Sequence, residues 1–461
     1  MQFDRRTFIK SGVATAAMAI PIAAEAAEVA QFRLFDQKSD SAYFAAGFGK
    51  ADITPDRPVP TIWDSSVATV MDPIHIRTTY FRSCGEQVVI VSCDLLALPT
   101  WFTDAVKHDL TKLGIPQDRV AINCSHTHTA PQIIFFRGTE STDDTYNNFV
   151  KERLVQSVKE AMADAGPATV GFGKIDAPLN VNRVQIGRLN QVNTLETPTG
   201  RVDQQLSVIR IYQSKSQKAG LIYNFAAHAL TVSANPHVIS ADYPGYTSGM
   251  LEAEPDIKFA QFTQGCAGNM NPRIHGDQTV TSQFARMLAD YVKKACTGIS
   301  MHSDPKLAMK TQAVHLPYGK IPSLQEVNSI LAADEKKMTS SEPSWDLLWA
   351  RAAKKALEDG RKFKNVDATF QGIRLGDIKI AVLPGEVFAE IGLAIKQRIG
   401  GNVITMGYSN NDEVGYIPIA EQFPLGGYEV ENAPRRYDLF PWSPKIEKYY
   451  VSRAVKLLRS L

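Results

Sequence analysis

Apolar residues along this chain follow two patterns that predict two kinds of secondary structure. Short runs that are continuously apolar, or that alternate between apolar and polar residues, are typical of strands. Longer stretches with apolar residues every three or four positions are typical of helices. The predicted strands lie at residues 46–54, 74–82, 88–93, 119–122, 169–173, 206–212, 219–225, 259–263, 378–383 and 403–406. The predicted helices lie at residues 103–113, 144–165, 245–254, 389–399 and 444–461.

Strands and helices follow one another along most of the chain, which predicts an α/β fold. We expect mixed β-sheets covered by helices, with the functional site at strand ends. Residues 323–364 differ, because two charged, Ala-rich helical stretches flank Ser340-Ser341-Glu342-Pro343. This pattern predicts a helical hairpin, interpreted as a surface insertion with a lid as the alternative. Without repeats or a low-complexity linker, residues 27–461 are expected to form a single domain.

The N-terminus has the features of an export signal. Residues 4–10 contain the pair Arg5-Arg6 and resemble a bacterial twin-arginine motif, and the apolar stretch 12–23 follows. Ala24-Glu25-Ala26 then provides a cleavage site between small residues. We therefore predict a signal peptide over residues 1–26 and a periplasmic or secreted protein, with an uncleaved anchor as the alternative. No segment of the mature chain is apolar enough to span a membrane.

Composition excludes some classes of function. Of 461 residues, 21% are charged and the formal net charge is +2, so the chain has no basic surplus that would indicate nucleic-acid binding. The odd number of cysteines and the absence of a C-x-x-C motif indicate neither a disulfide framework nor a zinc–thiolate site, although a single disulfide stays open. The cysteines are Cys84, Cys93, Cys124, Cys266 and Cys296.

Two histidines directly follow a predicted strand. His126 and His128 lie in the segment 125–129, after the apolar run 119–122. In extended backbone, residues i and i+2 point to the same side. Both imidazoles could therefore face one cleft and bind a metal such as zinc. A short H-x-H motif also occurs by chance in polar loops, and the motif alone leaves that alternative open.

Other polar residues also follow predicted strands. His228 comes at the end of strand 219–225, where the alternative to a metal ligand is a buried structural histidine. Asp94 follows strand 88–93 and either faces a cleft or serves as a helix cap or structural acceptor. The turn 264–272 is rich in Gly and Asn. It is either a plain tight turn or a place where the backbone approaches a ligand closely.

Eight motifs together carry a resemblance to a known family. The chain resembles the catalytic domain of the neutral/alkaline non-lysosomal ceramidases from about residue 45 to about residue 437, with the helical hairpin poorly matched. In chain order the motifs are A-G-F-G-K-A-D-I-T-P, S-H-T-H-T-A-P, N-R, N-F-A-A-H, I-S-A-D-Y-P-G-Y, Q-G-C-A-G-N-M-N-P, L-P-G-E-V-F and S-N-N-D-E-V-G-Y-I.

The resemblance implies one zinc ion per chain. Imidazole, carboxylate and phenolate donors suit zinc. Bound zinc lowers the pKa of water towards about 7 and polarises a carbonyl oxygen. By the same resemblance, His128 is the candidate for proton transfer to the leaving group, and Arg183 is the candidate for holding an oxyanion or a substrate oxygen. The residues at the family's ligand positions are His126, His228, Glu386 and Tyr416.

One motif departs from the family. Ceramidases carry G-D-V-S-P-N where this chain has G-N-M-N-P-R at residues 268–273, so Asn271 replaces an active-site serine. An amide can orient a carbonyl but cannot act as a nucleophile. Asn271 joins His128 and Arg183 as a catalytic candidate, and we also expect the family's C-terminal immunoglobulin-like domain to be absent. The candidate substrate contacts are Asp94, Asp242, Asn269 and Asn411.

These features favour an exported zinc-dependent amidohydrolase or deacylase that acts on an acylated small or lipid-like substrate. Two alternatives remain. One is a zinc enzyme that cleaves a sugar or glycan linkage, since kinship of fold does not fix chemistry. The other is an inactive binding protein that has kept the fold. The sequence leaves the oligomeric state open.

Overall fold

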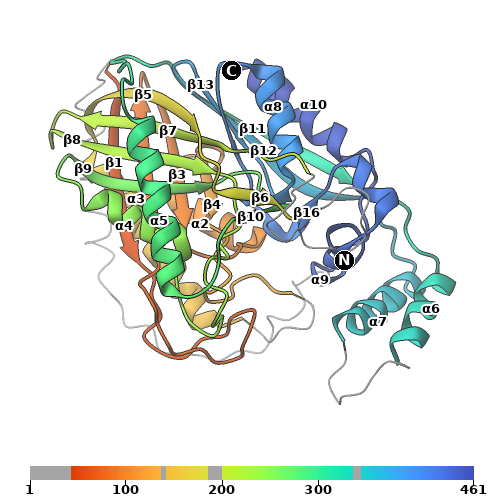
Figure 1. Ribbon diagram of the computed structural model, residues 1–461. Coiled ribbons are helices and arrows are strands. Elements are labelled where there is room, and N and C mark those ends of the chain that lie inside the picture. Colours follow the sequence, from red (N-terminus) through yellow and green to blue (C-terminus); the bar gives the residue numbers. More distant parts are fainter. Residues whose placement is uncertain (1–42, 137–141, 185–199, 336–343) are drawn as a thin grey trace.

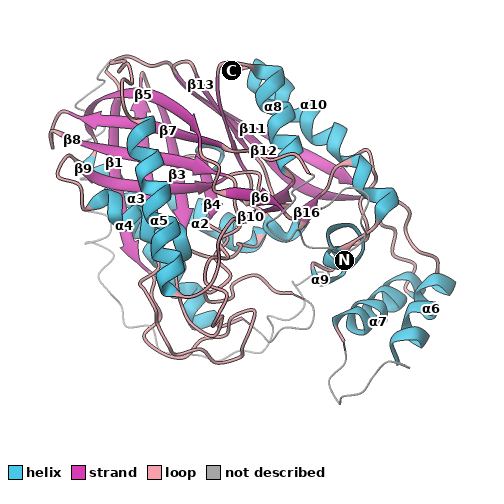
Figure 2. Cartoon of the chain, in the orientation of Figure 1, coloured by secondary structure: helices cyan, strands magenta, loops and turns pink. Residues whose placement is uncertain are grey.

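The computed structural model describes residues 43–136, 142–184, 200–335 and 344–461 (Figure 1). The predicted signal peptide and the centre of the predicted hairpin lie outside these residues. Two β-sheets pack face to face in the middle of the molecule, and helices cover their outer faces (Figure 2). The predicted fold class, mixed sheets covered by helices, is confirmed.

The larger sheet has eight strands in the order β4-β3-β2-β1-β5-β7-β8-β9. The pairs β3–β4 and β8–β9 are parallel, and the other neighbours are antiparallel. The strands are β1 (Ala45–Asp52), β2 (His75–Ser83), β3 (Glu86–Cys93), β4 (Val120–Cys124), β5 (Gly166–Asp176), β7 (Gln205–Gln213), β8 (Lys218–Phe225) and β9 (Ile257–Gln264).

The smaller sheet has the order β11-β12-β13-β15, and two short pairs lie beside the sheets. Its strands are β11 (Leu307–Pro317), β12 (Asn365–Leu375), β13 (Ile378–Val382) and β15 (Asn402–Met406). The first short pair, β6 (Asn180–Asn182) with β10 (Met270–Pro272), is antiparallel. The second, β14 (Glu386–Val387) with β16 (Tyr416–Ile417), is parallel.

Helices pack on both outer faces. On the larger sheet lie α2 (Thr100–Thr111), α3 (Asp144–Asp164), α4 (Asp242–Glu252) and α5 (Gln278–Ala295). On the smaller sheet lie α8 (Ala389–Ile399) and α10 (Ile446–Arg459). The helices α6 (Leu324–Glu335) and α7 (Trp345–Glu358) form the predicted hairpin beside the short α9 (Ala433–Arg436). Among the described residues, no helix combines the length and apolar character needed to cross a membrane.

Alternation along the strands explains the layers. In β3, Val88 and Ile90 enter the core between the two sheets, while Val89 and Val91 face helices α2 and α3. Successive side chains of a strand point to opposite faces, so a strand buried on both faces is apolar throughout, as β3 is. The sheets thus place their strand ends, and the loops after them, between two helical layers.

The sequence patterns do not predict three of the longer elements, α5, β11 and β12, nor the short β6, β10, β14, β16 and α9. Helix α5 carries a clear amphipathic signal, with Phe284, Leu288 and Val292 buried on one face, so this omission was avoidable. Strand β11 exposes much of its length and contains polar residues. Its apolar alternation is therefore weak, and its position is set by pairing with β12.

Candidate metal centre

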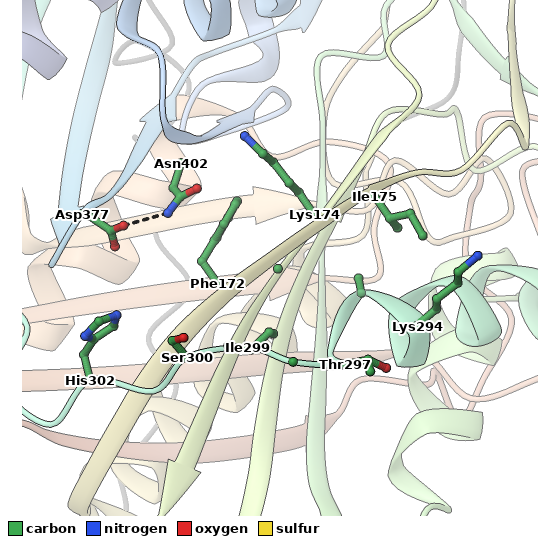
Figure 3. A pocket seen from close by; sticks show the side chains of 13 residues that line it. Phe172, Lys174, Ile175, Lys294, Thr297, Ile299, Ser300, His302, Asp377 and Asn402 are labelled. Atoms are coloured by element: carbon green, nitrogen blue, oxygen red, sulfur yellow. Dashed lines mark hydrogen bonds between the residues drawn. The ribbon is translucent and has the colours of Figure 1, made fainter.

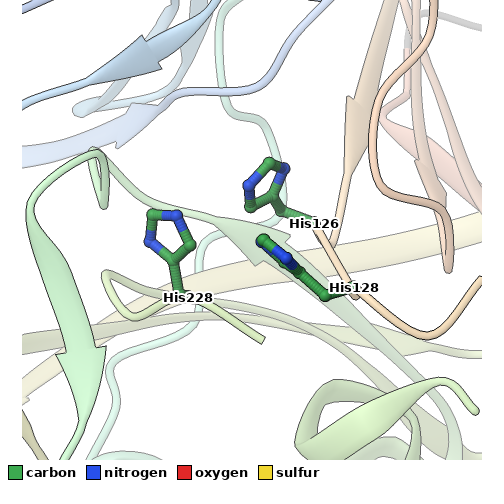
Figure 4. Close-up of side chains that lie close together, drawn as sticks. All are labelled: His126, His128 and His228. Carbon is green, nitrogen blue, oxygen red and sulfur yellow. The ribbon is translucent and has the colours of Figure 1, made fainter. Parts of the chain in front are cut away.

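Loops that follow two different strands bring three histidines together (Figure 4). His126 and His128 come after β4, and His228 comes directly after β8. One ring nitrogen from each histidine lies within 4.8 Å of the others. A set of imidazoles at this spacing is able to hold a metal ion.

His126 is held in one ring orientation. Its backbone has a φ of 63°, in the left-handed region that a residue with a side chain rarely adopts. Its Nδ1–H donates to the carbonyl of Leu96 over 2.8 Å, and the ring packs 4.3 Å from that of Tyr408, measured between centroids. Because Nδ1 is used in this way, the lone pair of Nε2 is left for a metal.

Hydrogen bonding of Nδ1 to backbone carbonyls also orients His228. Its Nδ1 lies 2.8 Å from the carbonyl oxygen of Ala267 and 3.1 Å from that of Met270. These two carbonyls belong to the Gly/Asn-rich turn, so that turn serves the site by fixing a histidine tautomer. Burial, followed by the charge of Arg183, lowers the pKa of His228 to about 4 and keeps the ring neutral.

Glu386 lies between the two imidazoles. Its Oε2 is 3.2 Å from Nε2 of His126 and 3.3 Å from Nε2 of His228. Its Oε1 accepts a hydrogen bond from the hydroxyl of Tyr437 over 2.6 Å. Burial would raise the pKa of the Glu386 carboxyl, but the two imidazoles outweigh burial and hold that pKa well below its usual range.

These three donor atoms fit a zinc ion. For metal–ligand distances near 2.0–2.1 Å, the edge of a tetrahedron is about 3.3 Å, which matches both separations from Glu386. Among the described residues, Nε2 of His126 and Oε2 of Glu386 are buried and have no hydrogen-bond partner. Buried polar atoms without partners are costly, and a shared cation would satisfy both. Two imidazoles and a carboxylate are also a donor set that zinc accepts.

Tyr416 and Arg183 lie next to this group. Nη2 of Arg183 donates to the hydroxyl of Tyr416 over 2.9 Å, and Nη1 lies 3.3 Å from Nε2 of His228. Glu429 holds the same guanidinium, with its Oε1 3.1 Å from Nη2 and 3.2 Å from Nε. Arg183 therefore carries a positive charge into the site in a fixed orientation.

His128 and Asn271 are partly buried, whereas His126, His228 and Glu386 are fully buried. Neither ring nitrogen of His128 has a hydrogen-bond partner in the described part of the chain. Burial, followed by the neighbouring histidines, lowers the pKa of His128 well below its usual value. The indole of Trp63, 46% exposed, donates to the His128 carbonyl over 2.7 Å. Asn271 accepts from Nη1 of Arg183 over 3.4 Å, so it faces the site although its strand neighbour Met270 does not.

Two of the residues predicted to contact substrate lie in ion-pair or turn structure. Asp94 is buried, forms a 3.1 Å ion pair with Arg77 and accepts from the His75 amide. Asp242 is buried at the start of α4 and accepts from the backbone amides of Thr231 and Val232. Both carboxylates are thus held by protein partners.

The other two predicted substrate contacts are also used within the protein. Asn269 accepts from the amide of Ala389 over 2.8 Å and donates to Glu390 over 2.8 Å, which caps helix α8. Asn411 accepts from the amide of Glu413 over 3.0 Å. For Asn411 this is the local bond that short polar side chains often make at turns, whereas the bond between Asn269 and Ala389 spans 120 residues. Both side chains are thus engaged by protein partners, and the Asn269 carbonyl also accepts from the Arg183 amide.

The sequence patterns gave no signal for Tyr437 and Glu429. Neither belongs to a motif, and each reaches the site through a contact that depends on tertiary structure. Gly268 of the turn approaches the backbone of Glu386 so closely that a Cβ atom there would lie 2.3 Å from the Glu386 carbonyl oxygen. The close approach made by Gly268 is thus to the strand that carries Glu386, and the expected approach of this turn to a ligand stays a prediction.

A separate cavity of about 380 Å³ lies between β5, the loop after α5 and the starts of β13 and β15 (Figure 3). Lys174, Lys294, His302, Asp377 and Asn402 contribute to its wall. Asn402 donates to Asp377 over 2.8 Å. None of the residues of the histidine site lines this cavity, so we assign the chemistry to the histidine site.

Comparison with known families agrees with this site. The family model described as neutral/alkaline non-lysosomal ceramidase, N-terminal, matches residues 44–314, more than half of the chain. The chain belongs to this family of hydrolases, which are metalloenzymes. The resemblance drawn from the motifs is confirmed.

Curated relatives match part of their own length. The neutral ceramidase of Pseudomonas aeruginosa is 25% identical over 260 residues, which are 52% of this chain and 38% of that protein. The neutral ceramidase of Mycobacterium tuberculosis is 25% identical over 178 residues, which are 35% of this chain and 28% of that protein. Both alignments span less than half of the relative.

Solved structures show the same fold. The crystal structure of neutral ceramidase from Pseudomonas aeruginosa matches with a TM-score of 0.70 at 18% identity, over 91% of this chain and 75% of that one. A ceramidase complexed with C2 matches with a TM-score of 0.68 at 17% identity, over 91% and 76% of the two chains.

Proposed function

We propose that this protein is an exported zinc-dependent hydrolase that cleaves the amide bond of an N-acylated, lipid-like substrate of the ceramide type, or the corresponding ester. The observation that carries the proposal is the arrangement of Nε2 of His126, Nε2 of His228 and Oε2 of Glu386. Their separations of 3.2 and 3.3 Å from the carboxylate suit tetrahedral zinc. Tyr416 would supply the remaining protein ligand.

Zinc bound there would activate a water molecule and polarise the scissile carbonyl. The chain's own residues would do the rest. His128, whose ring has no hydrogen-bond partner among the described residues, would take up a proton at a ring nitrogen and pass it to the leaving amine. Arg183 would hold the carbonyl oxygen as it gains negative charge. Asn271 would orient the substrate through its amide, because it cannot act as the family's serine does.

A buried apolar cluster lies beside the site. Leu96, Ala97, Ile134 and Phe136 pack together, with Tyr437 against them. The ring of Phe136 meets that of Tyr437 edge to face at 4.9 Å between centroids. Tyr437 reaches Glu386 from this cluster, so the cluster supports the carboxylate from inside the protein. The lipid-like substrate is supported by the names of the curated relatives, which are neutral ceramidases.

The test combines metal content with acyl release. Purified mature protein is expected to contain about one zinc per chain and to release fatty acid from N-acyl sphingoid bases or related N-acyl amides. His126→Ala and Glu386→Ala should lose both the zinc and the activity. A matched control is His237→Ala, which changes an exposed histidine of similar chemistry. Wild-type protein that has not met a chelator and holds no zinc would overturn the proposal, as would unchanged zinc in both site variants.

Export is a separate part of the proposal, and it rests on the twin-arginine motif and the apolar stretch after it. In a bacterial host, the chain is expected in the periplasm or medium, shortened by about 26 residues. Arg5→Lys/Arg6→Lys should leave it in the cytoplasm at full length. Export of that variant would show that this motif is not the signal.

A further inference from the structure

The helical hairpin packs against one short segment of the chain, residues 433–440. The buried ring of Trp349 on α7 packs edge to face against Phe440 at 5.8 Å between centroids, and its indole N–H donates to the carbonyl of Leu439 over 3.1 Å. Phe363, after α7, also packs on Phe440, at 4.8 Å. In Figure 1 the hairpin stands at the edge of the molecule, with α7 next to α9.

Both arginines of α9 are held by side chains of α7. Arg435 donates to Asp346 over 2.9 Å, and its guanidinium carbon lies 5.3 Å from the centre of the Trp349 ring. The guanidinium carbon of Arg436 lies 5.5 Å from the centre of the Trp345 ring. The Asp346–Arg435 pair is about three-quarters buried, with side chains 22% and 23% exposed. Because the pair is partly buried, it contributes more to stability than an exposed ion pair does.

The residue directly after α9 is Tyr437, which holds the candidate metal ligand Glu386. Its ring is wedged against the backbone of Gly415, where an added Cβ would lie 2.8 Å from the ring, and its hydroxyl reaches Oε1 of Glu386. Glu429, which holds Arg183, lies in the π-helical turn Tyr428–Asn432 that runs into α9. One segment therefore contacts the hairpin at its arginines and the catalytic site at Tyr437 and Glu429.

A helix of four residues has almost no stability of its own, because the cost of nucleating a helix is spread over too few hydrogen bonds. The position of α9 must therefore come from tertiary contacts, and the hairpin provides those on one side. Removing a group that orients a metal ligand without touching the metal typically weakens metal affinity 10–100-fold. Tyr437 is such a group for Glu386, so a shift of α9 would lower metal affinity in the same way.

We propose that the α6–α7 hairpin is a positioning element for the metal centre: Asp346 and Trp349 fix α9, so that Tyr437 holds the Glu386 carboxylate in its metal-binding orientation. This inference rests on the proposed function, since it assumes that Glu386 binds the metal. It gives the hairpin a role beyond that of a surface insertion, and it makes Asp346, Trp349 and Arg435 positioning residues rather than catalytic ones.

The test measures zinc affinity by competition with a chromophoric chelator. Asp346→Ala is expected to weaken zinc binding about tenfold, and Tyr437→Phe at least as much. In the double variant, Asp346→Ala should add nothing to Tyr437→Phe, because the hairpin acts through that hydroxyl. The matched control is Lys355→Ala, which removes an exposed ion pair with Asp359 on the same helix and should leave zinc affinity unchanged. If Asp346→Ala does not fold, the isosteric Asp346→Asn replaces it.

Two further readouts separate positioning from general stability. The exchanged pair Asp346→Arg/Arg435→Asp should recover zinc affinity at least in part, which would tie the loss to this ion pair. Amide hydrogen exchange of metal-free protein should be faster over residues 433–437 in Asp346→Ala than in wild type. Additive losses in the double variant, or unchanged zinc affinity in Asp346→Ala, would overturn the inference. If wild type holds no zinc, the proposed function fails instead. The hydrogen-exchange result over residues 433–437 then tests on its own whether the hairpin fixes α9.

Discussion

Glu386 and Tyr416 are direct partners across the parallel pair β14–β16. Residues paired in this register lie on neighbouring strands about 4.8 Å apart, with side chains on the same face. A glycine with positive φ precedes each of them, Gly385 at 77° and Gly415 at 62°. A Cβ at Gly385 would lie 2.5 Å from the Gly415 carbonyl oxygen, so these glycines allow the strands to bring a carboxylate and a phenol together.

This pairing predicts that Tyr416 is a metal ligand. Tyr416→Phe removes only the hydroxyl, and zinc affinity is expected to fall by at least about tenfold. The ring should stay in place, because it is buried and packs against Tyr428. Zinc dissociation constants of the two proteins provide the comparison. The control is Tyr428→Phe, which removes a hydroxyl from the adjacent ring and should leave zinc bound. Equal zinc affinity in Tyr416→Phe and wild type would assign Tyr416 to holding Arg183 alone.

His128 is predicted to move protons without holding the metal. His128→Ala should lower kcat by about 10²–10⁴-fold, the usual contribution of a general acid–base group, while zinc content stays near that of wild type. Turnover and metal content are measured on the same preparation. Because all three histidines lie within 4.8 Å of one another, the choice between ligand and proton carrier is open to experiment. Loss of zinc from His128→Ala would make His128 a ligand.

Gly268 is predicted to be irreplaceable for steric reasons. In Gly268→Ala the new methyl group would lie 2.3 Å from the carbonyl oxygen of Glu386. Relief of this clash would require a backbone shift, with a loss of about 1–3 kcal/mol in the free energy of unfolding and weaker zinc binding. Urea denaturation and zinc titration measure the two effects. Gly249→Ala is the control, since a Cβ there meets nothing within 4 Å and alanine should stabilise helix α4 by up to about 1 kcal/mol. Equal stability of the two variants would contradict the steric argument.

Much of the site was accessible from the sequence because its residues follow apolar strands. His126, His128 and His228 come just after β4 and β8, and the end of a buried strand is a place where polar side chains meet. The family resemblance supplied Glu386 and Tyr416. The structure places Glu386 between two of the histidines and Tyr416 against Arg183, which contacts His228. The order of the strands in the sheets then explains why site residues that are about 100 to 290 positions apart in the sequence lie close together in the fold.

The remainder depends on contacts that leave no pattern in the sequence. Tyr437 and Glu429 lie on irregular backbone whose position is set by the hairpin and the strands around it. The sequence pattern around Asp94 is compatible with both a cleft residue and a structural hydrogen bond, and only the fold shows its buried ion pair with Arg77. Asp242, Asn269 and Asn411 are polar residues of turns and caps, and their sequence pattern does not distinguish a bond to the backbone from a bond to substrate.

Asp412 gives a prediction for the pH dependence of stability. Burial raises the pKa of its carboxyl to about 7, whereas an unfolded aspartate titrates near about 4. Between these values the folded protein binds more protons than the unfolded chain, so Asp412 makes stability fall as pH rises through that range.

Asp412→Asn cannot ionise and keeps an oxygen that can accept from the amide of Leu98, which now lies 3.1 Å from Oδ2. The variant should exceed wild type in free energy of unfolding by on the order of 1–3 kcal/mol above pH 7, with the two approaching each other towards pH 4. Urea denaturation from pH 4 to pH 8, with chelator in both samples, measures the difference. His228, with a pKa of about 4, titrates in both proteins and cancels. A difference that stays constant over this range would show that Asp412 is already ionised in the folded protein.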